Sequence, residues 1–244
     1  MKQIVCMKWG TLYGADYVNR LYRMISRNIT GPFRLVCLTD DVNDIIPEVE
    51  CHPCPTVPLR APECNYGWRK VSLWGSTIPG YTSGDVLFLD LDTVITGSLD
   101  SFFEQPGDFI VCPNWTQSGQ GIGNTSVYRF RIGSHTELYD QLVARGPEIL
   151  ATYPNSQTYI SRTIPAGAMT FWPDSWCCSF KVHCVPKGPR RWFIEPQLPP
   201  GTKVVAFPGV PNPPDAVIGH WPAPWYKRFY KHIRPTGWVA QHWQ

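Results

Sequence analysis

Short apolar runs alternate along the chain with segments in which apolar residues recur every three or four positions. The runs at residues 3–9, 33–39 and 85–90 have the length of strands, and their composition indicates that they are buried. Between the first two runs, residues 14–29 carry apolar side chains at helical spacing, and Gly31 with the proline after it ends that segment. The opening third of the chain therefore predicts strand, helix, strand and a later buried strand.

The same alternation continues toward the C-terminus. We expect strands at 49–52, 108–112, 125–132 and 203–209, and helices at 66–76, 135–150, 156–164 and 225–233. Strands that alternate with helices predict an α/β fold with a mostly parallel central sheet flanked by helices. No internal repeat or linker interrupts the pattern, so we expect a single domain over residues 1–244, loop-rich from about 186 to 244 because prolines concentrate there.

Three of the predicted strands end in polar groups. Lys8, Trp9 and Gly10 follow the first strand, Thr39, Asp40 and Asp41 end the second, and the third ends in the sequence Asp-Leu-Asp at 90–92. In open α/β sheets, ligands bind beyond the carboxyl ends of the strands. We therefore expect these three strand ends to line one crevice.

The two carboxylates of Asp90 and Asp92 are the most informative part of that crevice. Residues two apart on a strand face the same side, and a bend after Asp90 would let both carboxylates converge. Two close carboxylates repel each other, and a hard divalent cation removes that repulsion while also binding substrate phosphates. The pattern predicts a Mg²⁺ or Mn²⁺ site for a phosphorylated ligand. The alternative is a solvated turn with two unrelated aspartates.

Composition narrows the function further. The net charge is +3 and the sequence pI about 8.4, far below the charge density typical of a nucleic-acid-binding protein. No apolar run is long enough to span a bilayer, and the N-terminus enters a strand directly, so we expect a cytoplasmic protein. The nine cysteines, an odd number spread through apolar runs, fit reduced thiols and lack the paired spacing of a zinc ribbon.

A family resemblance agrees with the carboxylate pair. The segment GDVLFLDLDTVITGSLDSFFE resembles the D-x-D segment of nucleotide-sugar glycosyltransferases with the GT-A fold, especially family 8 and its bacterial relatives. VCMKWGTLYGADYVNRLYRMI is similar to their first strand and helix, and FRLVCLTDD to their second strand. NTSVYRF, SQTYISR and GHWPAPW are similar, in order, to their acceptor-side strand, their acidic-glutamine motif and their C-terminal histidine motif.

The resemblance implies a transferase that moves a hexosyl group from a nucleoside diphosphate, most readily a UDP-sugar, with retention at the sugar carbon. Asp92 would bind the metal, Asp90 would bind the ribose, a metal-bound water or the metal itself, and His220 would complete the metal site. The implied acceptor-side catalytic residues are Gln157 and Asn124. The implied donor-binding residues are Lys8, Trp9, Gly10, Tyr17, Thr39, Asp40, Arg69, Lys70, Asp90, Leu91 and Lys181. Trp9 or Tyr17 would stack on the base. The cations of Arg69, Lys70 and Lys181 would bind the phosphate oxygens.

Two departures from the family pattern keep alternatives open. Ser156 stands where the family has an acidic residue. The loss of that carboxylate makes a protein that binds a nucleotide-sugar without turnover one alternative. The second departure is that the motif at His220 lacks its usual lysine. The sequence FLDLDT also fits a haloacid-dehalogenase-type phosphatase, with Asp90 as nucleophile and Asp92 as acid and base. That family's downstream acidic residue is Cys112 here.

The C-terminal part carries a second pattern. Residues 225–234 interleave Lys227, Arg228, Lys231 and Arg234 with aromatic side chains. As a helix, this segment is suited to peripheral contact with the inner face of an anionic membrane, where a lipid-linked acceptor would lie; a glycan or a small-molecule acceptor fits the resemblance as well. The alternative is a helix that covers the core with its basic face in water.

Overall fold

The computed structural model describes residues 1–60 and 67–244 and divides them into two compact units. The first unit contains Met1–Asn19, Gly31–Leu91 and Ser101–Trp172, and the second contains Arg20–Thr30, Asp92–Asp100 and Pro173–Gln244. The single domain over 1–244 stays a prediction. Each unit is described below by itself.

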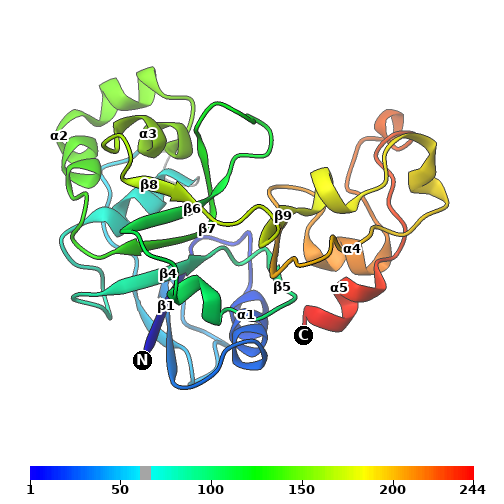
Figure 1. The fold of residues 1–244 in the computed structure, drawn as a ribbon, viewed down its shortest axis with the longest axis horizontal. Helices are drawn as coiled ribbons and strands as arrows, with labels where there is room; N and C mark the ends of the chain where they lie inside the picture. The colour runs from blue at the N-terminus through cyan, green and yellow to red at the C-terminus, as the bar shows by residue number, and fades with distance from the viewer. Residues whose placement is uncertain (61–66) are drawn as a thin grey trace. The chain divides into compact units, whose positions relative to one another are not determined.

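A seven-stranded sheet forms the centre of the first unit. Its strand order is β3-β2-β1-β4-β7-β6-β8. The bounds are β1 Lys2–Lys8, β2 Phe33–Thr39, β3 Glu50–Pro53, β4 Asp85–Leu89, β6 Phe109–Pro113, β7 Gly123–Arg131 and β8 Met169–Phe171. Strands β3, β2, β1 and β4 are parallel to one another, β7 is antiparallel to both of its neighbours, and β8 is parallel to β6 (Figure 1). The expected α/β fold with a mostly parallel sheet is confirmed.

Helices cover this sheet, as the periodicity predicts. The helices α2 (Glu137–Thr152) and α3 (Ser156–Thr163) contact each other, and both contact the 3₁₀ helix η2 (Gly67–Trp74) (Figure 1). Helix α1 (Ala15–Arg27) follows β1 and is divided between the units, with residues 15–19 in the first and 20–27 in the second; it buries Val18, Leu21, Met24 and Ile25, the face that its helical spacing predicts. The expected helix over 66–76 is thus a 3₁₀ helix, and Tyr66 lies outside the described residues.

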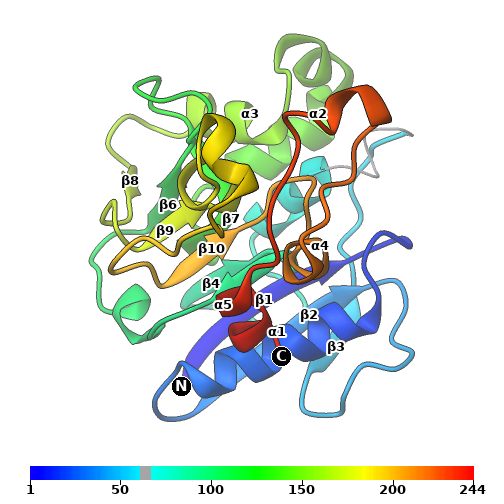
Figure 2. The same cartoon turned by 90° about the vertical axis from the view of Figure 1, so that its right-hand side faces the viewer.

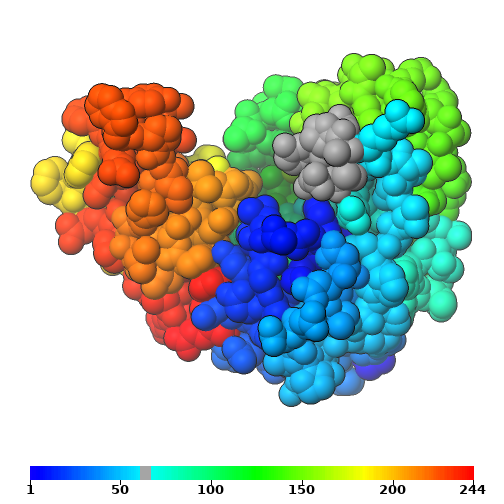
Figure 3. All heavy atoms as spheres, turned by 180° about the vertical axis from the view of Figure 1, so that it is seen from behind, coloured from blue at the N-terminus to red at the C-terminus, as the bar shows by residue number. Residues whose placement is uncertain are grey.

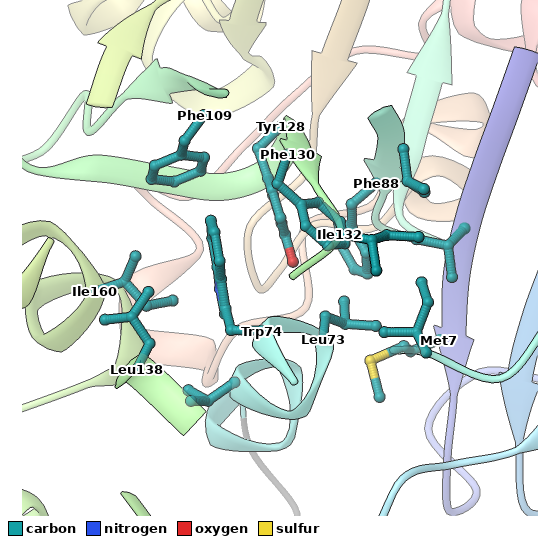
Figure 4. Packing of buried hydrophobic residues seen from close by; sticks show 14 of the residues in the cluster. Met7, Leu73, Trp74, Phe88, Phe109, Tyr128, Phe130, Ile132, Leu138 and Ile160 are labelled. Carbon is teal, nitrogen blue, oxygen red and sulfur yellow. The ribbon is translucent and has the colours of Figure 1, made fainter. Parts of the chain in front are cut away.

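An aromatic cluster fills the core between the sheet and η2. The Trp74 ring lies edge-on to Phe109 at 4.8 Å and parallel to Tyr128 at 6.3 Å between centroids, and Tyr128 stacks on Phe88 at 4.8 Å (Figure 4). Val5 and Met7 of β1 and Val36 and Leu38 of β2 belong to the same core, because strand side chains alternate between the two faces. This packing holds η2 against the sheet and therefore positions the side chains that η2 carries.

The second unit is built around a small sheet of order β5-β10-β9. Its strands are β5 (Thr93–Ile95), β9 (Cys177–Ser179) and β10 (Val204–Ala206); β10 is antiparallel to β5 and parallel to β9, beside which it lies in Figure 2. The helices α4 (Pro213–Ile218) and α5 (Gly237–His242) contact each other. The remaining short elements of the second unit are η4 (Phe180–Cys184), η5 (Gly188–Trp192) and η6 (Trp225–Lys227). The element η3 (Asp100–Phe103) contains the sequence boundary between the units, which falls after Asp100.

The expected helix over residues 225–233 is wrong. Only a single 3₁₀ turn, η6, forms there. Ile233 is the only buried large apolar residue of the segment, so almost no tertiary packing rewards a helix, and a short helix is marginal in water without such packing. Among the described residues, no helix combines the length and the apolar character that a bilayer span requires.

Candidate functional site

The carboxyl ends of β1, β2 and β4 lie at the same edge of the first unit's sheet. Strand β1 pairs with β2 in parallel up to Lys8 and Thr39, and it pairs with β4 in parallel on its other side. The polar residues that follow β1 and β4 are therefore neighbours in space, as the sequence predicts. Asp90, directly after β4, donates its backbone N–H to the Ser126 carbonyl at 2.9 Å, which extends the sheet pairing by one residue.

A cavity of about 360 Å³ lies at this edge. Its lining residues come from the end of β1, from the loop after β1 and from the end of β4: Met7, Trp9, Gly10, Thr11, Leu12, Tyr13, Asp90 and Leu91. The lining combines aromatic and aliphatic side chains with one carboxylate, which is the chemistry of a site for a flat ring attached to hydroxyl groups. Tyr17 is not part of this lining, but its ring lies 4.7 Å from that of Tyr13.

The loops after β1 and β2 are tied together beside the cavity. Gly10 adopts a positive φ of 62° and donates its N–H to Asp40 Oδ2 at 2.9 Å. Lys8 is buried, and its ammonium donates to the Asp41 carbonyl at 3.2 Å and lies 3.7 Å from Asp41 Oδ2. The Thr39 hydroxyl donates to the same carbonyl at 2.8 Å. Lys8, Thr39 and Asp40 therefore shape the loops, and none of the three lines the cavity.

Asp41 has a lowered pKa in this arrangement. The N–H of Asn43 donates to Asp41 Oδ1 at 3.0 Å and is the largest cause, and the charge of Lys8 acts in the same direction. Asp41 follows Thr39 and Asp40 at the strand end that the sequence predicts in the crevice, but it does not line the cavity. Its exposed position makes it a loop residue whose carboxylate neutralises the buried Lys8.

Asp90 forms an ion pair with a cation that sequence reasoning assigned to phosphate. Lys70 Nζ, on η2, lies 2.5 Å from Asp90 Oδ1 and also donates to the Thr125 carbonyl at 3.3 Å. Both side chains are largely shielded, with 11% of Lys70 and 20% of Asp90 exposed. The neighbouring Arg69 guanidinium lies 5.8 Å from the centre of the Trp9 ring. Lys70 thus holds Asp90, while Arg69 lies against an aromatic wall of the cavity.

Tyr128 is a further residue behind Asp90 that sequence reasoning missed. Its ring is fully buried in the core, and burial raises its pKa well above the ordinary value, with the Asp90 charge adding to the effect. Among the described residues its hydroxyl has no hydrogen-bond partner. The alternating pattern of β7 identifies Tyr128 as a core residue, but nothing in the sequence places its hydroxyl near Asp90.

The expected acceptor-side residues lie on β7 and α3. Asn124 is buried at the start of β7, and its Oδ1 accepts the Ser126 N–H at 3.0 Å. Gln157, in the first turn of α3, accepts a hydrogen bond at Oε1 from Asn114 Nδ2 at 3.3 Å. Asn114 was not selected from the sequence. The neighbouring Ser156 is also buried, with 4% of its surface exposed.

Three expected site residues belong to the second unit. Asp92 is 8% exposed, and its carbonyl accepts the Phe207 N–H at 3.1 Å. Lys181 donates to the Pro208 carbonyl, and burial lowers its pKa, with Lys231 adding to the shift and Asp92 opposing it. His220 follows the helix α4, whose last turn accepts the His220 N–H at the Asp215 carbonyl, 2.8 Å away.

The donor set of Asp90, Asp92 and His220 matches divalent cations in chemistry. Carboxylate oxygens suit Mg²⁺ and Mn²⁺, and imidazole suits Mn²⁺. Asp90 lies in the first unit, whereas Asp92 and His220 lie in the second. Within residues 1–60 and 67–244, no group of three histidine, cysteine or acidic side chains is gathered into a metal site. The eight described cysteines are free, and Cys64 lies outside the described residues.

Comparison with solved structures identifies the fold. The structure of galactosyltransferase LgtC in complex with donor and acceptor sugar analogs is 12% identical over 86% of this chain and 88% of that one, with a TM-score of 0.61. The glycosyltransferase GlyE of Streptococcus pneumoniae TIGR4 is 12% identical, with a TM-score of 0.57, over 87% of this chain and 56% of that one. The bifunctional glycosyltransferase WbbM has the same identity and TM-score over 87% and 46%. The chain therefore spans about half of the length of these last two proteins, and its fold is that of GT-A glycosyltransferases.

No protein-family profile matches the chain. A comparison with curated proteins likewise finds no match.

Proposed function

We propose that this protein is a glycosyltransferase that uses a nucleoside diphosphate sugar, most readily a UDP-sugar, together with Mn²⁺ or Mg²⁺. The observation that carries the proposal is the cavity of about 360 Å³ at the carboxyl ends of β1 and β4, with Trp9 and Asp90 in its lining. In open α/β sheets this is the edge at which ligands bind. The likeness of the fold to LgtC, GlyE and WbbM supports sugar transfer as the reaction.

The lining suggests how the nucleoside is held. The aromatic rings of Trp9 and Tyr13 offer flat apolar surfaces for a base, and stacking on an aromatic ring contributes about 1–3 kcal/mol per base. Gly10 carries no side chain beyond its backbone, so the loop after β1 leaves room for the ligand. The Asp90 carboxylate accepts hydrogen bonds from ribose hydroxyls or binds a metal ion.

The charged residues divide into two roles. Lys70 fixes the position of the Asp90 carboxylate through the 2.5 Å ion pair, so we assign it a positioning role. Asp92 and His220, both in the second unit, would hold the metal ion, which when bound would stabilise the negative charge that develops on the departing diphosphate. We assign Arg69 to the phosphate oxygens, and Lys181, whose pKa burial lowers, stays a phosphate ligand expected from the sequence alone.

The acceptor side is the least specified part of the proposal. Gln157 and Asn124 are the polar residues that we assign to it, and Asn114 holds the Gln157 amide at Oε1. The resemblance to family 8 favours a hexosyl donor and retention at the sugar carbon. The acceptor is a glycan, a lipid-linked sugar or a small molecule.

Calorimetry tests the donor site. UDP should bind the wild type with Mn²⁺ and bind Trp9→Ala more weakly, whereas Phe171→Ala, an exposed aromatic on β8, should bind as the wild type does. Turnover of UDP-sugars is then measured as release of UDP with and without candidate acceptors. Metal-dependent UDP binding without turnover would favour the non-catalytic alternative that Ser156 suggests. Phosphate release from a phosphomonoester that disappears in Asp90→Asn would instead identify a phosphatase.

A further inference from the structure

Two segments of the second unit form one surface, which we call the cationic aromatic surface. It consists of residues 187–193 and 220–234. The Trp192 ring stacks on the His232 ring with centroids 3.9 Å apart and an interplanar angle of 8°, and Arg234 Nη1 lies within 3.5 Å of the Trp192 carbonyl. These contacts tie the two segments together, so that their side chains belong to the same surface.

Aromatic side chains on this surface stand in solvent. Trp225 is 82% exposed, Phe229 81% and Phe193 78%, and Tyr226 and Tyr230 are more than half exposed. The atoms of the segment 220–234, orange-red in Figure 3, lie at the surface. Gathered exposed aromatics are unusual on a soluble protein and mark an interaction site. Within residues 220–234, Ile233 is the only large apolar residue that is buried, so the other large apolar side chains of this segment are in contact with solvent.

The same two segments carry one sign of charge. They contain Lys187, Arg190, Arg191, Lys227, Arg228, Lys231 and Arg234, and neither segment contains an aspartate or a glutamate. Basic side chains interleaved with aromatic ones are the pattern by which a protein segment lies in the interface of an anionic bilayer. The charge of the surface therefore favours an anionic partner with an apolar layer beneath its charges.

A cavity opens within this surface. Its volume is about 320 Å³, and its lining includes Arg228, Lys231, Trp221 and His232. The Trp221 Nε1–H is buried and has no hydrogen-bond partner among the described residues. Two cations and a free N–H donor in one cavity match the acceptor oxygens of a phosphate group. His220, which we assign to the metal, lines the same cavity.

We propose that the cationic aromatic surface docks the protein on an anionic phospholipid bilayer. The exposed rings of Trp225, Phe229 and Phe193 enter the interfacial layer, where aromatic rings are favoured at the level of the headgroups. Arg228 and Lys231, which both line the cavity, bind lipid phosphate. No helix inserts, because η6 is a single turn, so the attachment is peripheral and reversible.

Co-sedimentation with vesicles tests the proposal. The wild type should pellet with phosphatidylcholine vesicles that contain phosphatidylglycerol and stay in solution with phosphatidylcholine alone. Each cation near an anionic membrane surface raises the binding constant about fivefold. The double variant Arg228→Gln/Lys231→Gln should therefore bind vesicles about 25-fold more weakly. Trp225→Ala/Phe229→Ala should weaken it about tenfold or more, because both rings lose their apolar contact with the bilayer. Higher salt should weaken the wild type.

A matched charge control is available. Arg23 and Arg162 are exposed cations outside the surface, and Arg23→Gln/Arg162→Gln makes the same change in net charge. This control should bind vesicles as the wild type does, and circular dichroism checks that every variant is folded. Equal loss in the control and in Arg228→Gln/Lys231→Gln would overturn the proposal, because binding would then follow net charge alone.

Two further outcomes separate a bilayer from other anions. Calorimetry with inorganic phosphate measures a soluble source of the same chemical group. Phosphate binding without any vesicle binding would overturn the membrane proposal and identify a soluble anion site. Vesicle binding that is displaced by a single-stranded oligonucleotide, and that does not fall in Trp225→Ala/Phe229→Ala, would also overturn it. Vesicle binding that depends on both the cations and the aromatic rings supports it.

Discussion

Replacing Asp90 with asparagine should destabilise the protein by about 2–3 kcal/mol. Removing one partner of a buried ion pair costs about 3–5 kcal/mol, because the other charge stays buried without its counter-charge. Here Lys70 Nζ lies 2.5 Å from Asp90 Oδ1, with 11% and 20% of the two side chains exposed. Residual access of water to both groups reduces the cost to about 2–3 kcal/mol, at or below the lower end of that range.

The pair should respond asymmetrically. Lys70→Met removes the more deeply buried charge and leaves the Asp90 carboxylate, which has more contact with water, so its cost should be smaller, about 1 kcal/mol. The double variant Lys70→Met/Asp90→Asn removes both charges and should be more stable than the sum of the single losses predicts. A coupling energy of about 1–3 kcal/mol is typical of residues in direct contact.

Urea denaturation of the four proteins measures this cycle. Asp108→Asn is the matched control, because Asp108 Oδ1 pairs with Arg131 Nη1 at 3.2 Å while about half of each side chain is exposed. An exposed pair contributes about 0–1 kcal/mol, so the control should stay close to the wild type. An Asp90→Asn protein as stable as the wild type, or additive losses in the cycle, would refute the buried ion pair as a source of stability.

Three other predictions concern the metal, the core and acid stability. Calorimetry of UDP with Mn²⁺ should show a larger loss in Asp92→Asn than in His220→Ala, because a charged ligand is lost in the first and a neutral one in the second; the reverse order would contradict the proposed metal site. Tyr128→Phe should be as stable as the wild type or more stable by about 1 kcal/mol in urea, because it removes a buried hydroxyl without a partner among the described residues; a clear loss would contradict that reading. Arg34, followed by His52, lowers the pKa of Glu50, so this carboxylate contributes stability at neutral pH that is lost as pH falls through and below about 4. Urea denaturation across that pH range should show a smaller loss of stability on acidification in Arg34→Gln than in the wild type. The same pH dependence of stability in both proteins would contradict the role of Arg34.

Much of the first unit follows from local sequence patterns. The apolar runs that end at Lys8, Thr39 and Asp90 become the neighbouring parallel strands β1, β2 and β4, and the helical spacing after β1 becomes α1. Parallel strands place their carboxyl ends at one edge, so the sequence also predicts that Trp9 and Asp90 lie at one cavity. These inferences succeed because side-chain periodicity reports the buried face of an element within a few residues.

Side-chain partners across the site were not readable in this way. Lys70 was expected on phosphate and lies on Asp90, and Asn114, which holds Gln157, was not selected. Both contacts join residues 20 or more positions apart, on elements whose relative placement is set by the aromatic core around Trp74. Spacing along the chain carries no information about such a contact.

The second unit shows the same division between sequence and tertiary structure. The apolar run of β10 predicts a strand, but only the structure pairs Val204 with Ile95 on one side and with Cys177 on the other. Residues 225–233 have the composition of a helix and form one 3₁₀ turn, because no core surface is available to their aromatic side chains. The sequence by itself determined which segments are apolar, where strands end in carboxylates and which segment is basic and aromatic. The tertiary structure decided which distant segments pair and which side chains meet, because those choices depend on packing summed over the whole unit and not on any local period.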